Sequence, residues 1–60
     1  MTNSFAAVFS NIEDELGGEL SAMAQYRFKK LVRKLMKEEN ETFDEACEEA
    51  AFTLAAEGEF

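Results

Sequence analysis

The chain has 60 residues, a net charge of −7, no proline, no histidine and a single cysteine. These values exclude an intramolecular disulfide and a zinc site built from histidine and cysteine, while an apolar content of 47% is too high for a disordered acidic tail. A chain this short buries only about 60% of the surface of its unfolded form, so we expect close helix packing or association with another chain to supplement the core.

Five apolar side chains recur at helical spacing over residues 4–16 and predict the first helix. They are Phe5, Val8, Phe9, Ile12 and Leu16. Asn3 or Ser4 is expected to cap its start by accepting a hydrogen bond from a backbone N–H. Gly17 and Gly18 are expected to end it, because glycine adopts the left-handed conformation at little cost.

Residues 19–39 form the second and longest predicted helix. Its apolar stripe again follows a spacing of three and four residues. The stripe consists of Leu20, Ala24, Phe28, Leu31, Val32 and Leu35. This helix also carries every basic residue of the chain, because all six lysines and arginines lie between Arg27 and Lys37.

The third predicted helix covers residues 43–57. Thr42 and Glu45 have the spacing of a capping box, in which each side chain accepts a hydrogen bond from the backbone of the other residue. The inward stripe is Phe43, Cys47, Ala50, Ala51 and Leu54. Gly58 is expected to stop the helix, and the small residues of the stripe should allow close approach to a neighbouring helix.

These patterns predict an all-α fold in a single helical domain over residues 1–60. Three amphipathic helices with short connections form either a small three-helix bundle or a helical hairpin with an N-terminal helical arm. We expect one shared core that contains Phe9, Ile12, Phe28, Leu31, Leu35, Cys47 and Leu54.

The outward side of the second helix is a candidate surface for binding a partner. The residues expected on it are Met23, Tyr26, Lys30, Arg33 and Lys37. Tyrosine, methionine and arginine are enriched at protein interfaces. In the alternative interpretation, the basic residues are neutralised by acidic residues of the third helix, and Met23 packs under the first helix.

Phe52 is a further candidate for partner contact. Its helical position lies away from the stripe between Cys47 and Leu54, so a hairpin of two helices would leave it uncovered. Coverage by the first helix or by Phe60 is the alternative.

The acidic clusters do not match the pattern of a catalytic or metal-binding site. A di-iron site needs Glu-x-x-His pairs and a calcium loop needs alternating oxygen ligands around a central glycine, and neither pattern occurs. Cys47 lies on the core stripe, and no histidine is present to act as its base. We therefore expect no catalytic residue, no metal site and no cofactor.

The sequence favours a small, acidic, non-enzymatic regulatory or accessory protein that binds another protein, itself or both through a helical face. A homodimer is the simplest assembly. The alternative is a role linked to nucleic acid, through DNA mimicry by the acidic surface or through phosphate contacts by the basic face of the second helix. Direct DNA binding by the third helix is not expected, because that helix carries acidic and no basic residues. Without a signal sequence or an apolar stretch of about 20 residues, we expect a cytoplasmic protein that does not act at a membrane.

Overall fold

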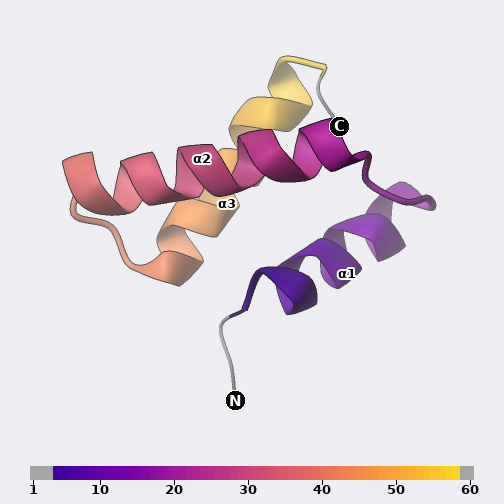
Figure 1. Cartoon of the computed structure of the whole chain (residues 1–60), viewed down its shortest axis with the longest axis horizontal. Helices are drawn as coiled ribbons and strands as arrows, with labels where there is room; N and C mark the ends of the chain where they lie inside the picture. The colour runs from indigo at the N-terminus through magenta and orange to yellow at the C-terminus, as the bar shows by residue number, and fades with distance from the viewer. Residues whose placement is uncertain (1–3, 59–60) are drawn as a thin grey trace.

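The computed structural model describes residues 4–58, which form three helices. They are α1 (Phe5–Leu16), α2 (Ala22–Glu38) and α3 (Phe43–Ala56). In Figure 1, α2 runs across the front of the molecule, α3 passes behind it, and α1 lies below α2. The prediction of an all-α fold of three helices is therefore confirmed.

The ends of α1 are set by a serine cap and a glycine. The Ser4 hydroxyl accepts a hydrogen bond from the Ala7 backbone N–H at 3.3 Å, so Ser4 is the cap. Asn3, the other expected cap, lies outside the described residues. Gly17 has a φ of 78°, and its N–H donates to the Glu13 carbonyl at 2.8 Å. This left-handed residue turns the chain out of the helix, as glycine does readily.

A network of hydrogen bonds across the first connection fixes where α2 begins. The Leu20 N–H donates to the Glu13 carboxylate at 2.9 Å, and the Gln25 side-chain amide donates to the Leu20 carbonyl at 3.1 Å. The Ser21 hydroxyl caps the helix by accepting from the Ala24 N–H at 3.1 Å. Because Leu20 is held by these contacts outside the helix, α2 starts at residue 22 and not at residue 19 as expected.

The predicted capping box at the start of α3 is confirmed. The Thr42 hydroxyl accepts from the Glu45 N–H at 3.2 Å, and the Glu45 carboxylate accepts from the Thr42 N–H at 3.0 Å. Before it, Asn40 has a φ of 57°, a left-handed conformation that asparagine tolerates better than most residues. This turn brings α3 back along α2, and these two helices pack most closely against each other.

The core joins residues of all three helices. Its buried members are Phe9, Leu20, Ala24, Phe28, Val32, Ala46, Cys47, Ala50 and Leu54. All seven residues predicted to share the core belong to it or pack against it. Two differences concern α1 and α3: Leu16, expected in the apolar stripe, is 51% exposed at the end of α1, whereas Ala46 is fully buried although it was not predicted.

Aromatic rings attach α1 to the hairpin of α2 and α3. Phe5 approaches Phe9, Phe28 and Phe43, with ring centroids 5.9, 6.2 and 5.2 Å away. Phe9 lies edge-on to Phe28 at 5.4 Å. Such pairs add about 0.5–1.5 kcal/mol each beyond the burial of their area. Phe28 therefore contacts both phenylalanines of α1 from the centre of α2.

Candidate functional site

One exposed side of α2 combines apolar and basic side chains around a shallow depression of about 400 Å³. The lining residues are Met23, Tyr26, Arg27, Lys30, Leu31 and Lys34. We call this surface the basic face. Its residues are neighbours because side chains three and four positions apart project from the same side of a helix.

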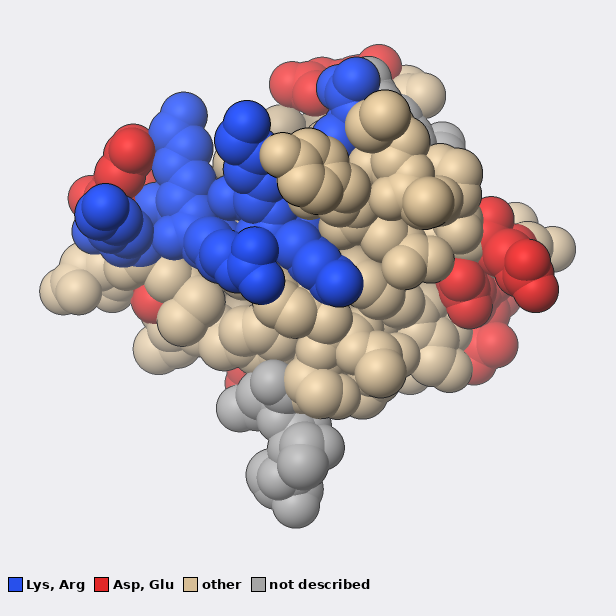
Figure 2. Space-filling model, in the orientation of Figure 1, with Lys and Arg blue, Asp and Glu red and all other residues tan. Residues whose placement is uncertain are grey.

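The apolar part of the basic face consists of Met23, Tyr26 and Leu31. Met23 is 59% exposed and Tyr26 is 61% exposed, whereas half-buried Leu31 continues into the core. Figure 2 shows lysine and arginine side chains gathered over α2, beside a broad area of uncharged surface. Large apolar side chains therefore lie open to solvent between flexible cations, an arrangement suited to an amphipathic partner.

The structure brings together Met23, Tyr26 and Lys30, three of the residues expected on the outward side of α2. Arg33 lies toward α1 instead, with its guanidinium carbon 6.0 Å from the centre of the Phe5 ring. Lys37 lies in the last turn of α2, where a cation interacts favourably with the helix dipole. Neither Arg33 nor Lys37 lines the depression.

Lys29, like Arg33, contacts phenylalanine rings of α1. Its ammonium nitrogen lies 5.9 Å from the centre of the Phe5 ring and 6.0 Å from that of Phe9. A cation over an aromatic face contributes about 0.5–1 kcal/mol at an exposed site. Apart from Lys37, the basic residues of α2 thus divide into Lys29 and Arg33, which contact α1, and those that line the basic face. Neutralisation of the basic residues by acidic residues of α3, the alternative interpretation given above, stays a prediction.

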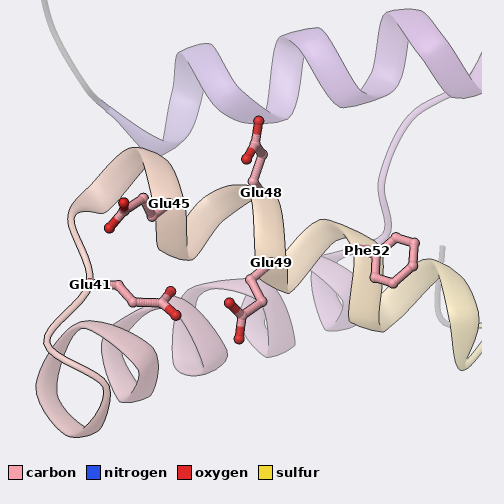
Figure 3. A pocket seen from close by; sticks show the side chains of 5 residues that line it. All are labelled: Glu41, Glu45, Glu48, Glu49 and Phe52. Atoms are coloured by element: carbon pink, nitrogen blue, oxygen red, sulfur yellow. The ribbon is translucent and has the colours of Figure 1, made fainter.

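A second depression, of about 680 Å³, lies on α3 and on the turn before it. Four glutamates and one phenylalanine line it: Glu41, Glu45, Glu48, Glu49 and Phe52. We call these five residues the acidic surface. Phe52 is 78% exposed and lies at one end of the row of carboxylates (Figure 3). Phe60, which was considered as a cover for Phe52, lies outside the described residues.

The carboxyl groups of Glu41 and Glu49 point toward each other within the acidic surface (Figure 3). Glu41 Oε1 is buried and accepts no hydrogen bond from residues 4–58. Partial burial raises the pKa of Glu41, and so do its contact with the Glu49 carboxyl and the negative charges of Glu49, Glu45 and Glu39. An unpaired negative charge is therefore unfavourable here, and a nearby cation would be stabilising.

The acidic residues do not form a metal site in the described part of the chain. No group of three or more histidine, cysteine, aspartate or glutamate residues between positions 4 and 58 could hold a metal ion. Cys47 is buried, and its pKa is raised by burial and by the charge of Asp44. A raised pKa disfavours the thiolate, which is the reactive form of a cysteine side chain.

A third depression, of about 550 Å³, lies between α1 and α3. Its apolar part is formed by Val8, Ile12 and Ala51, and the buried Cys47 also borders it. Asn11, Glu15, Asp44 and Glu48 complete the lining. Sequence reasoning missed this groove because helical periodicity does not show which sides of α1 and α3 lie next to each other.

Comparisons with models of protein families, with curated proteins and with solved structures found no match for this chain. No helix within residues 4–58 is both long and apolar enough to cross a membrane. Function is therefore inferred from the surfaces themselves.

Proposed function

We propose that this chain is a non-enzymatic accessory protein that binds an acidic amphipathic helix of a partner protein on the basic face of α2. The observation that supports this most directly is the depression in which exposed Met23 and Tyr26 lie beside Lys30 and Lys34. Helix-binding surfaces recognise a row of apolar side chains at positions i, i+3, i+4 and i+7. Acidic residues on the flanks of such a row would lie beside the lysines.

The chemistry of the basic face favours a protein over a nucleic acid. A phosphate backbone is bound by cations and gains little from apolar surface, whereas Met23, Tyr26 and Leu31 form the apolar part of the depression. The net charge of −7 also repels a polyanion at long range. A partner with a few carboxylates and several apolar side chains matches both features.

Tyr26 makes the proposal directly measurable. It is the only tyrosine and the chain has no tryptophan, so tyrosine fluorescence reports on the basic face alone. The probe is a synthetic helical peptide with glutamates on its flanks, phenylalanine and leucine at i, i+3, i+4 and i+7, and neither tyrosine nor tryptophan. We expect saturable binding that changes the Tyr26 emission and protects it from quenching by acrylamide.

Two charge reversals provide a matched comparison. Lys30→Glu and Lys37→Glu each lower the net charge by two, from −7 to −9, but only Lys30 lines the depression. We expect Lys30→Glu to weaken binding of the peptide by more than about tenfold, because the new carboxylate would lie close to the glutamates of the peptide. Lys37→Glu should change the affinity little. Equal losses in both variants, or tighter binding of duplex DNA than of the peptide, would contradict the proposal.

A further inference from the structure

We infer that the basic face of one copy binds the acidic surface around Phe52 of a second copy. This inference rests on the proposed function and names the partner as the chain itself. It begins from the separation of charge along the sequence. All six basic residues lie between Arg27 and Lys37, whereas every charged residue after Lys37 is acidic. Each copy therefore presents one basic helix, α2, and two acidic helices, α1 and α3, of which α3 carries the exposed Phe52.

The two surfaces also match in their apolar parts. On the acidic surface, Phe52 projects into solvent with an exposed fraction of 78% beside Glu48 and Glu49. On the basic face, Met23 and Tyr26 form an exposed apolar area beside the lysines. An aromatic ring packs well on a thioether and on another ring. Insertion of Phe52 between Met23 and Tyr26 would place glutamates of one copy beside lysines of the other.

Charge repulsion within the acidic surface supports the same pairing. Glu45 and Glu49 are one helical turn apart, and like charges at this spacing destabilise a helix. The Glu41 carboxyl faces Glu49 as well, and its pKa is raised in part by that charge. Lysines from a second copy would offset this repulsion, so the contact stabilises the acidic surface in addition to burying Phe52.

The contact joins two different surfaces, and each copy carries both a basic face and an acidic surface. A symmetric pair would make the contact twice, and a head-to-tail arrangement would extend it to further copies. The net charge of −7 opposes the approach of two copies at long range. At about 0.1 M salt the screening length is about 10 Å. Salt therefore weakens this long-range repulsion more than it weakens the attraction between opposite charges in direct contact.

A charge-swap experiment tests the inference. One variant carries Lys30→Glu with Lys34→Glu, and the other carries Glu48→Lys with Glu49→Lys. The four positions are exposed, and circular dichroism checks that both variants remain helical. Sedimentation velocity at about 0.1 M salt measures association of the wild type, of each variant and of their equimolar mixture.

We expect the wild type to associate, and each variant alone to associate at least about tenfold more weakly. In the first variant the basic face becomes negative like the acidic surface, and in the second the acidic surface loses its net charge. The mixture should recover association, since the unchanged basic face of the second variant and the unchanged acidic surface of the first remain complementary. Phe52→Ser alone should also associate more weakly than the wild type.

A mixture that stays as weakly associated as its components, or a wild type that is monomeric at millimolar concentration, would overturn the inference. Binding of the acidic peptide to a monomeric wild type would overturn self-association and leave the proposed function standing.

Discussion

Replacing Phe28 with alanine should remove the core ring that contacts both phenylalanines of α1. The Phe28 side chain is fully buried and meets the rings of Phe5 and Phe9 at 6.2 and 5.4 Å. Truncation of a buried phenylalanine to alanine costs about 3–5 kcal/mol, which includes the cavity that remains. At about 0.05–0.15 kcal/mol per residue, a 60-residue chain has roughly 3–9 kcal/mol of stability to lose. We therefore expect Phe28→Ala to lose at least about a third of the stability, and to unfold completely if the wild type lies at the lower end of this range.

Urea titration followed by far-ultraviolet circular dichroism measures this effect. A small domain unfolds with a slope of about 1 kcal/mol/M, so a loss of 3 kcal/mol lowers the midpoint by about 3 M. If Phe28→Ala has no folded baseline, Val32→Ala provides a measurable transition. Val32 is fully buried, and loss of its two methyl groups should cost about 2 kcal/mol.

Phe52→Ala is the matched control because it makes the same chemical change at a residue that is 78% exposed. In dilute solution, where copies do not associate, it should change the free energy of unfolding by less than about 0.5 kcal/mol. A Phe28→Ala variant as stable as the wild type, or an equal loss in both variants, would refute the assigned register of α2 and α3.

Three further predictions concern the cap of α3, the Glu41 carboxyl and the Cys47 thiol. Thr42→Ala removes the capping box and should cost about 1 kcal/mol in urea titration; an unchanged midpoint would contradict the role of the cap. Because the folded state raises the pKa of Glu41, it binds that proton more tightly than the unfolded state, and stability falls as pH rises through the folded pKa. Glu41→Gln should therefore stabilise the protein at pH 7, with a benefit that disappears below the ordinary pKa of about 4.3; a benefit independent of pH would exclude this cause. Burial and a raised pKa should make Cys47 react slowly with a disulfide reagent until urea unfolds the chain, and rapid reaction of the native protein would show that the core opens easily.

The helices and most of the core could be predicted because local patterns encode them. Ser4 caps α1, and the Thr42 and Glu45 capping box opens α3, both as expected from residue type and spacing. The start of α2 could not be predicted, because the Glu13 carboxylate holds Leu20 across the connection. Leu16 follows the helical period of α1 but is its last residue and is 51% exposed. The local pattern does not show which end of α1 a neighbouring helix covers.

The candidate surfaces were predictable to a lesser degree. Met23, Tyr26 and Phe52 were expected outside the core from their helical angles, and all three are exposed. Arg33 was expected among the outward cations, but α1 comes to lie beside α2 and places Phe5 next to it. The groove between α1 and α3 was missed for the same reason, since the placement of α1 depends on contacts among aromatic rings from all three helices.

Amide chemical-shift mapping tests the central claim that the basic face is the binding surface. The acidic peptide is titrated into ¹⁵N-labelled protein, and the shift of each backbone amide is followed. We expect the largest shifts in residues 23–34, with small shifts at Val8, Ile12 and Ala51 in the groove between α1 and α3. Shifts concentrated in that groove, or spread evenly over the chain, would contradict the assignment of binding to the basic face.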